Sequence, residues 1–394
     1  MSDLVVRCYN VGFGDAVLVS IPERSPGGDE TVRHLLFDVG NLLAGEGNRD
    51  EVFPTVVADI ARRTGGTVDL FVMTHEHLDH VQGLLAASDA GIHLGADHAW
   101  LTGSSAPDYY ETHPDSRKRR LEQRLALEDA IRLQSADSDP WLATMIRNNS
   151  TMLPPDAQGL STSEYVDHLR ALAPAARTHY VDRTTDIAGK HPFREARLRI
   201  LAPEADTSAY YGPGGGVGSL TATAAVDVAP ASHRLRRADG LVSPPPGVDP
   251  GAFFDLLTSR RRTTRTRVME IDAANNNTSV VVEAEWRGWR LLFPGDAEIP
   301  SWNHMAEQGE LRPVHFVKVA HHGSRNGMDE ELLDRLMPPV SPDDRPRHAV
   351  VSTHDGDWDS VPDPRTLASY SSRCELHDTR TVDRGTPVEV SFPG

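Results

Sequence analysis

Residues 69–80 read DLFVMTHEHLDH and place three histidines and an aspartate directly after a short apolar run. Residues 69–73 predict a short buried strand, because a brief apolar run bounded by polar residues is typical of one. His75 and His77 are two residues apart, a spacing that separates side chains on a helix but lets them converge at a strand end. Together with Asp79 and His80, they are predicted to bind metal at a strand–loop–helix corner.

Two other interpretations of this cluster are weaker. The chain contains 18 histidines, so any single pair could belong to a histidine-rich surface loop. A zinc-protease helix requires H-E-x-x-H, and Asp79 occupies the position of its second histidine. Four ligand-type side chains in the order H-x-H-x-D-H at a strand end therefore favour a metal site.

Length and composition indicate a soluble protein with a substantial core. The chain has 394 residues, a formal net charge of −17 and two cysteines, Cys8 and Cys374. Two cysteines do not make a disulfide framework, and no apolar run approaches the roughly 18–20 residues of a membrane span. The N-terminus, MSDLVVRCYNVG, lacks the pattern of a signal peptide. We therefore expect a cytoplasmic protein that does not associate with membranes, and the acidic charge argues against a general nucleic-acid coat protein.

The order of strand-like and helix-like segments predicts a single α/β domain over residues 1–394. Its core would comprise residues 1–106 and 191–394, with two sheets packed between two layers of helices. Residues 107–190 are charged and helical in pattern, so we expect a helical insertion there. Residues 204–250 are rich in Gly, Pro, Ala and Ser, and the basic run RRRTTRTR follows at residues 260–267. This composition predicts a mobile Gly/Pro-rich and basic loop over residues 204–267.

Further candidate ligands lie in the C-terminal half, again at the ends of expected strands. LLFPGDAE ends one strand with Asp296, and FVKVAHHGS ends another with His321 and His322. Taken singly, Asp296 would suit a turn after Gly295, and His321 would suit the start of a helix. The joint pattern favours metal ligands that complete the set begun by His75 and its neighbours.

The order H-x-H-x-D-H, then G-D, then H-H-G-S resembles the metallo-β-lactamase superfamily. More narrowly, the sequence is similar to the cytoplasmic hydrolase domain of ComEC-type DNA-uptake channel proteins and to the soluble phosphorylcholine esterases. The segments that carry this similarity are VGFGDAVLV, LLFDVGN, VMTHEHLDHVQGL, NNNTSVVVEAEWRGWRLLFPGDAE and VKVAHHGSRNG. The resemblance as a whole covers about residues 4–104 and 268–393. The resemblance implies a four-layer αββα sandwich with a two-metal hydrolytic site.

The resemblance also implies which residues bind the two ions. His75 and His77 would bind the first ion. Asp79 and His80 would bind the second, and Asp296 would bridge the pair. The spacing does not decide which of two neighbours, His321 or His322, completes the second site. The residues expected to act in catalysis are Asp79, Asp296 and His322.

A supporting set of residues matches positions near the site or would face substrate: Asp15, Asp38, Asn277, Ser324, Arg260, Arg261 and Arg262. Asp38 would hold a ligand imidazole through its distal N–H, which fixes the orientation of the ring. Asp15 and Asp38 equally suit turns beside Gly14 and Gly40. Residues 275–277 suit a turn, because Asn tolerates the backbone conformations of turns, or would contact substrate oxygens. The arginine run would contact phosphates or form a solvated face.

Two departures from the family pattern affect the expected site. Val361 stands where ComEC-type domains usually have the histidine of a His-Pro pair. No histidine between His80 and Asp296 stands in a recognisable third motif. We therefore expect the first ion to keep an open position, which a phosphate oxygen would fill.

These features predict a dinuclear metal-dependent hydrolase. Two ions about 3.5–4 Å apart can share a water, lower its pKa towards neutrality and stabilise the charge of a phosphoryl transition state. We expect Zn²⁺ or Mn²⁺, because the ligands are imidazoles and carboxylates without thiolate. A phosphodiesterase or nuclease is favoured, with a phosphodiester as substrate and nucleic acid as one candidate form of it. The alternatives are hydrolysis of a lactone, another ester or a cyclic nucleotide, and a non-catalytic role in a complex. The oligomeric state is left open.

Overall fold

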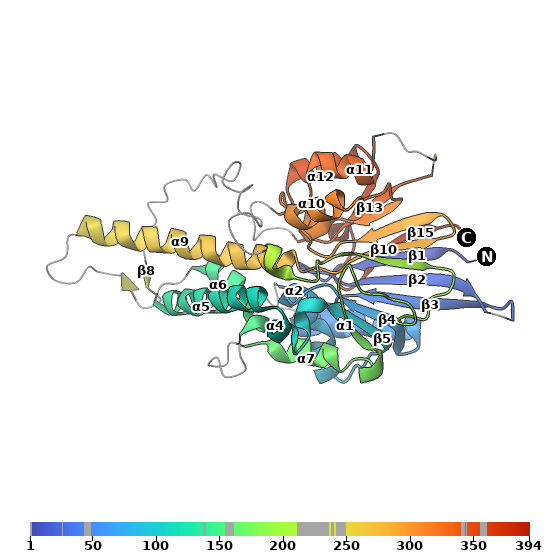
Figure 1. Cartoon of the computed structure of the whole chain (residues 1–394), viewed down its shortest axis with the longest axis horizontal. Coiled ribbons are helices and arrows are strands. Elements are labelled where there is room, and N and C mark those ends of the chain that lie inside the picture. The colour runs from blue at the N-terminus through green and yellow to red at the C-terminus, as the bar shows by residue number, and fades with distance from the viewer. Residues whose placement is uncertain are drawn as a thin grey trace.

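The computed structural model is a mixed α/β fold with two large sheets and helices packed against them (Figure 1). It describes residues 2–25, 27–42, 49–136, 139–153, 161–210, 236–237, 240–241, 250–339, 343, 345–354 and 361–394. The chain begins and ends in one sheet, because the first strand pairs antiparallel with the last.

The first sheet has the strand order β15-β1-β2-β3-β4-β5-β6. The strands are β1 (Leu4–Tyr9), β2 (Val17–Arg24), β3 (Glu30–Phe37), β4 (Thr67–Met73), β5 (Gly95–Thr102), β6 (Thr178–Val181) and β15 (Pro387–Phe392). β15, β1, β2 and β3 pair antiparallel, whereas β3, β4, β5 and β6 pair parallel.

The second sheet repeats this division, with the order β14-β13-β12-β11-β10-β7. Its strands are β7 (Arg197–Ala202), β10 (Val281–Trp286), β11 (Trp289–Phe293), β12 (Phe316–Lys318), β13 (His348–Val351) and β14 (Glu375–Asp378). β7, β10 and β11 pair antiparallel, and β11, β12, β13 and β14 pair parallel. A separate hairpin is formed by β8 (Arg236–Arg237) and β9 (Gly240–Leu241).

The main hydrophobic core lies between the two sheets. Val19 and Leu70 contribute from the first sheet, and Val282 and Leu291 contribute from the second. Alternate side chains of a strand point to opposite faces, so the other face of each sheet is left for helices. α1 (Arg49–Thr64), α3 (Gly83–Asp89) and α7 (Ser163–Arg170) pack on the first sheet. α10 (Ile299–Glu307), α11 (Glu330–Leu336) and α12 (Pro364–Ser371) pack on the second.

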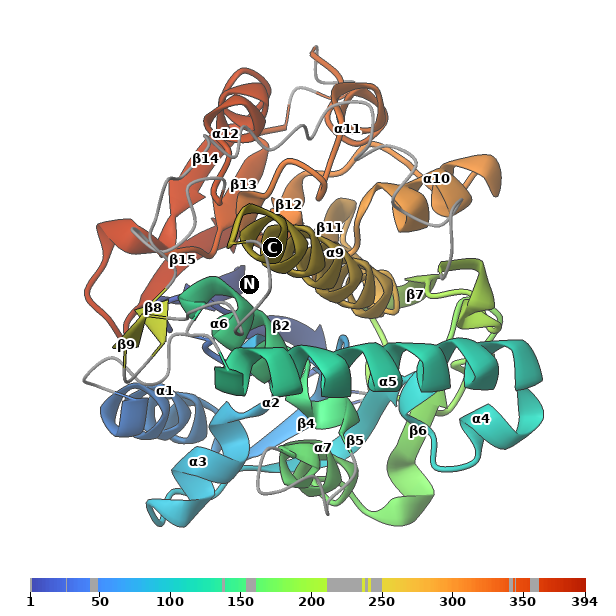
Figure 2. The same ribbon diagram turned by 90° about the vertical axis from the view of Figure 1, so that its left-hand side faces the viewer.

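A further group of helices has a small core of its own. It contains α4 (Tyr109–Thr112), α5 (Pro114–Ala136), α6 (Pro140–Asn148), the 3-10 turn η2 (Ser150–Met152) and α9 (Pro250–Asn276). Leu127, Ile146 and Val268 belong to the apolar cluster that joins α5, α6 and α9. α6 begins where the Asp139 side chain accepts the N–H of Leu142 at 3.3 Å. We call α5, α6 with its C-cap residue Asn149, η2 and α9 the helical cover, because α5, α6 and α9 lie in front of the sheets in Figure 2.

α9 corrects the expectation of a mobile loop over residues 204–267. Residues 250–267 are helical, residues 207–210 form a 3-10 turn, and residues 211–235 and 242–249 lie outside the described part. The helix forms because its apolar face, including Val268 and Ile271, packs on α5 and α6, a tertiary stabilisation that local composition does not reveal. At 27 residues it is about 40 Å long. No helix in the described ranges, α9 included, has both the length and the apolar character needed to cross a bilayer.

The expected end of the helical insertion, at residue 190, also needs correction. β6 falls inside that range but pairs parallel with β5 at the edge of the first sheet. Val181 is buried in the core between the sheets, which explains why this segment extends rather than continuing as a helix. The helical part of the insertion therefore ends before Thr178.

Candidate metal centre

The ligand-type side chains meet at the carboxyl ends of strands from both sheets. Loops that follow parallel strands gather at one edge of a sheet, which is where α/β proteins build their sites. The side chains brought together are His75 and His77 after β4, Asp79 and His80 in α2 (Leu78–Val81), Asp296 after β11, and His322 in the 3-10 turn η5 (Ala320–Gly323). The fold thus joins residues as far apart in sequence as Asp79 and His322, which are 243 positions apart.

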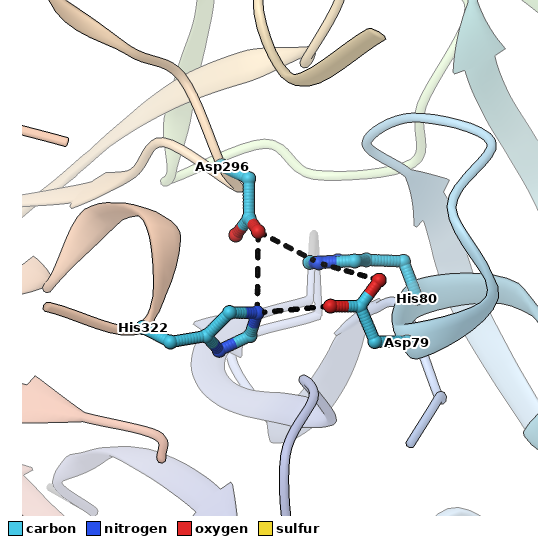
Figure 3. Close-up of side chains that lie close together, drawn as sticks. All are labelled: Asp79, His80, Asp296 and His322. Carbon is cyan, nitrogen blue, oxygen red and sulfur yellow. Dashed lines mark hydrogen bonds and ion pairs between the residues drawn. The ribbon is translucent and has the colours of Figure 1, made fainter. Parts of the chain in front are cut away.

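The tightest group contains Asp79, His80, Asp296 and His322 (Figure 3). His322 Nε2 lies 3.2 Å from Asp79 Oδ2 and 3.2 Å from Asp296 Oδ2. His80 Nε2 lies 3.3 Å from Asp296 Oδ2 and 3.9 Å from Asp79 Oδ1. Ligand atoms around a four-coordinate Zn²⁺ with bonds of 2.0–2.1 Å lie about 3.3 Å apart. The spacing of these four side chains therefore suits one such ion.

A second group contains His75, His77 and Asp79, so Asp79 belongs to both groups. His75 Nε2 and His77 Nδ1 face each other at 3.0 Å. Asp296, the residue expected to bridge the ions, belongs to the first group, and Asp79 is the carboxylate common to the two. The first group has four members and the second has three.

The outward-facing nitrogen of each clustered histidine has a hydrogen-bond partner. His80 Nδ1 donates to Asp38 Oδ2 at 2.8 Å, and His322 Nδ1 donates to the Ser352 carbonyl at 2.9 Å. His75 Nδ1 lies 3.1 Å from Thr74 Oγ1, whose own proton goes to Asp38 Oδ2 at 2.6 Å. His77 Nε2 lies 3.0 Å from Asn149 Oδ1. Such partners fix the tautomer and orientation of metal-binding imidazoles.

These outer hydrogen bonds provide a test of whether the residues fit a metal. If His75 Nδ1 and His77 Nε2 carry the protons, then His75 Nε2 and His77 Nδ1 direct two lone pairs at each other across 3.0 Å. A cation between them removes that repulsion. In addition, Asp79 Oδ1 and Asp296 Oδ1 are buried and form no hydrogen bond with any described residue. Imidazole and carboxylate donors without thiolate suit Zn²⁺ or Mn²⁺, so the residues present fit divalent ions.

Electrostatics within the cluster agree with this fit. Burial disfavours the charged imidazole, but the carboxylates of Asp296, Asp79 and Asp38 hold the pKa of His80 well above its ordinary value. The pKa of His322 is raised to about 10, because Asp296 again outweighs the cost of burial. Burial and the neighbouring imidazole of His80 hold the pKa of His75 well below its usual range. Two imidazolium groups therefore neutralise the carboxylates where divalent cations would otherwise do so.

Two glycines allow neighbouring backbone segments to pack closely against the loop that carries Asp79 and His80. A Cβ atom on Gly40 would collide with the backbone of Asp79 and His80, and one on Gly14 would collide with the carbonyl oxygens of Gly40 and Asp79. The Val39 N–H donates to the His80 carbonyl at 2.9 Å, and the Asp15 N–H donates to the Asp79 carbonyl at 3.1 Å. Close backbone approach therefore explains the two glycines beside the candidate ligands.

The structure separates the two neighbouring histidines that the sequence left open. Both adopt left-handed backbone conformations, with φ of 46° at His321 and 52° at His322, which is rare and costly for residues other than Gly. His322 points into the first group. His321 instead has Nδ1 2.9 Å from Ser324 Oγ and Nε2 3.3 Å from Asn276 Nδ2. Ser324 is therefore a partner of His321, and His321 is absent from both ligand groups.

Three supporting residues occupy distinct places. Asp38 contacts His80 as expected of a residue that holds an imidazole. Asp15 pairs with the buried ammonium of Lys318 at 2.5 Å, and its other oxygen lies 3.9 Å from His322 Nδ1. Asn277 does not face the cluster, which corrects that expectation. Its Oδ1 accepts the N–H of Ser301 at 3.0 Å in the first turn of α10, and its Nδ2 donates to the Ala273 carbonyl.

The arginine run lies on α9 rather than in a loop. The side chains of Arg260, Arg261 and Arg262 lie outside the described part, although their backbone is helical. Arg265 pairs with Asp139 at 2.7 Å and lies over the Trp141 ring, which ties it to α6. Arg265 therefore forms a structural contact with α6 and does not belong to a purely solvated face.

Sequence reasoning missed residues that the helical cover contributes. Asn149 and Asp272 lie beside His77. The buried carboxyl of Glu298 contacts Asn276 and His321. Burial raises the pKa of Glu298 to about 8. The sequence signal that could have identified Asp272 is an acidic residue on the apolar face of a helix. Val268, Asp272 and Asn275 are spaced i, i+4 and i+7, which places them on one side.

No protein-family model matches this chain, and no curated protein matches it either.

Proposed function

We propose that this chain is a dinuclear metal-dependent hydrolase built on a four-layer αββα sandwich of the metallo-β-lactamase type, and that it cleaves phosphodiester bonds. The observation that carries the proposal is the buried pair of ligand groups that share Asp79, at the carboxyl ends of strands from both sheets. The sequence motifs that resemble the superfamily supply these same residues, which supports the assignment of fold type and chemistry together.

The residues divide the work of such a reaction. His75 and His77 would hold one ion, and His80, Asp296 and His322 the other, with Asp79 next to both. When bound, the two ions would activate water and stabilise negative charge on the phosphate. Asp38 and the Ser352 carbonyl keep the rings of His80 and His322 aimed inward. Positioning of this kind lowers the reorganisation that the reaction requires.

Two arginines contact the residue that lies between His75 and His77. Arg120 of α5 donates to Glu76 Oε2 at 3.1 Å, and Arg170 lies 4.0 Å from the other oxygen of the same carboxylate. Arg170 also pairs with Asp167 at 2.6 Å, so each of the two guanidinium groups has a carboxylate partner. The preference for a phosphodiester over a neutral lactone therefore rests on the sequence motifs and on the three-membered ligand group, which leaves a coordination position for a phosphate oxygen.

The proposal is tested by activity on paired substrates. Protein reconstituted with Zn²⁺ or Mn²⁺ should hydrolyse a chromogenic phosphodiester, and it should act poorly on a lactone of similar size. Asp296→Asn preserves size but removes the charge, so turnover should fall roughly a thousandfold, as expected when several kcal/mol of charge stabilisation are lost. Single-stranded DNA, duplex DNA, RNA and a cyclic nucleotide then define the substrate class. Greater activity on the lactone, or full activity of Asp296→Asn, would contradict the proposal.

A further inference from the structure

The helical cover contacts the metal-binding loop at successive residues. Arg120 binds Glu76, and the Thr151 hydroxyl donates to the Glu76 carbonyl at 2.6 Å. The Asp79 N–H donates to Asn148 Oδ1 at 3.4 Å. Of these contacts, the one at His77 bears most directly on a metal, because it involves the ring itself.

His77 presents its two nitrogens to different parts of the molecule. Nδ1 faces His75 Nε2 at 3.0 Å, which is the side on which an ion would bind. Nε2 faces the helical cover, 3.0 Å from Asn149 Oδ1 and 3.6 Å from Asp272 Oδ1. Asn149 cannot exchange its oxygen and nitrogen without losing bonds. Its Nδ2 donates to Asp272 Oδ1 at 2.9 Å, and its Oδ1 also accepts from Asn275 Nδ2 at 2.8 Å.

This arrangement determines the tautomer of His77. A fixed acceptor at Nε2 requires the proton there, which leaves the Nδ1 lone pair directed inward. The Asp272 carboxylate accepts from Asn149 Nδ2 at 2.9 Å and lies 3.6 Å from His77 Nε2, so it holds the Asn149 amide and the ring in this orientation. Asn149 is fully buried and Asp272 is buried, so solvent does not replace these contacts.

We propose that Asn149 and Asp272 are positioning residues for His77, and that the helical cover thereby controls metal binding at the His75–His77 pair. The inference rests on the metal-binding role of His75 and His77 in the proposed function. It adds that this ion depends on α6 and α9, elements that carry none of the ligand motifs. The outer partners of His80 and His322, Asp38 and the Ser352 carbonyl, lie directly after strands β3 and β13. The ion bound by His80, Asp296 and His322 should therefore be independent of α6 and α9.

The test measures Zn²⁺ affinity rather than activity. Asp272→Asn and Asn149→Leu are titrated against a chromophoric chelator, in the intact chain and in a His322→Ala background that leaves the His75–His77 pair. Glu270→Gln serves as the matched control, because Glu270 is exposed on the same helix. Each positioning variant should lower the affinity for one of the bound ions by roughly 10- to 100-fold and leave the affinity for the other unchanged. The double variant should lose less than the sum of the two effects, because the residues act through one contact.

Several outcomes separate this inference from the proposed function. Wild-type affinity for every ion in Asp272→Asn and Asn149→Leu would overturn it. So would equal weakening of all ions with a lower melting temperature of the metal-free variants, which indicates a merely structural role. If the variants lose one ion as expected but the wild type hydrolyses no phosphodiester, the inference stands and the proposed function fails.

Discussion

Two clusters of histidines and carboxylates lie at opposite ends of β13. One is the candidate metal centre, where the Ser352 carbonyl after β13 accepts the proton of His322 Nδ1. The other, at the start of the strand, contains His348, Glu375 and His377. Its distances are as short as those of the first cluster. His348 Nδ1 lies 3.2 Å from His377 Nε2 and 3.4 Å from Glu375 Oε2.

The clusters differ in burial and in their outer contacts. The side chain of Glu375 is 66 % exposed, whereas His80 and His322 are 0 % exposed. In each histidine of the candidate centre, the ring nitrogen that faces away from the cluster has a hydrogen-bond partner. Within the described residues, no hydrogen bond holds the second ring nitrogen of His348 or His377. Metal affinity depends on ligands that are already oriented, so we expect short distances alone to be insufficient at the exposed cluster.

Metal content is the largest effect that separates the two clusters. After reconstitution with Zn²⁺ or Mn²⁺ and desalting, elemental analysis should find about two ions per chain. His77→Ala and His322→Ala should each remove about one ion. His348→Ala combined with His377→Ala should remove none, which makes it the matched control. Recovery of no metal from the wild type would contradict the dinuclear site, and loss of an ion from the control would contradict the comparison.

The backbone support of the buried cluster gives a smaller effect. Gly40→Ala places a methyl group against the backbone of Asp79 and His80, so the loop must move or the protein must strain. We expect a loss of about 1–3 kcal/mol in the free energy of unfolding, measured by urea denaturation of metal-free protein. Gly27→Ala is the control, since its nearest neighbour would be 3.6 Å away. Equal stability of the two variants would show that the loop tolerates displacement.

The pH dependence of metal binding provides a third difference between the two clusters. The pKa of His80 is held well above its ordinary value, and that of His322 is raised to about 10, so both rings are protonated at pH 7 without metal. Metal binding must displace these protons. Affinity should therefore rise by up to about tenfold per pH unit for each proton between pH 6 and 8. Burial lowers the pKa of His348, so Zn²⁺ bound there would show no such rise above neutral pH. A flat profile for the wild type would contradict displacement from the buried cluster.

Much of the candidate site could be predicted because its signals are local. A strand end followed by H-x-H-x-D-H, and further strand ends at Asp296 and His322, indicate converging ligands without knowledge of the tertiary structure. The sequence alone did not indicate which of His321 and His322 points into the ligand group. The direction of each ring depends on two consecutive residues in the left-handed backbone conformation, which the surrounding packing stabilises.

The helical cover could be predicted only in part. Residues 114–136 have helical character, but the threonines and like charges of residues 260–267 favour helix weakly. α9 gains its stability from contacts of Val268 and Ile271 with α5 and α6, which are distant in sequence. The contribution of Asp272 to the site depends on that packing, so it was invisible for the same reason.

The burial of the candidate centre has a consequence for its kinetics. All six ligand-type side chains are at most 2 % exposed, so we expect ions and substrate to reach them only when the surrounding structure, which includes the helical cover, opens. Exchange with solvent is then limited by how often the protein opens locally rather than by diffusion. Bound ions should consequently leave slowly even in strong chelator, and the rate should follow the opening of the cover. The same contacts that orient His77 would set how long the protein retains its metal.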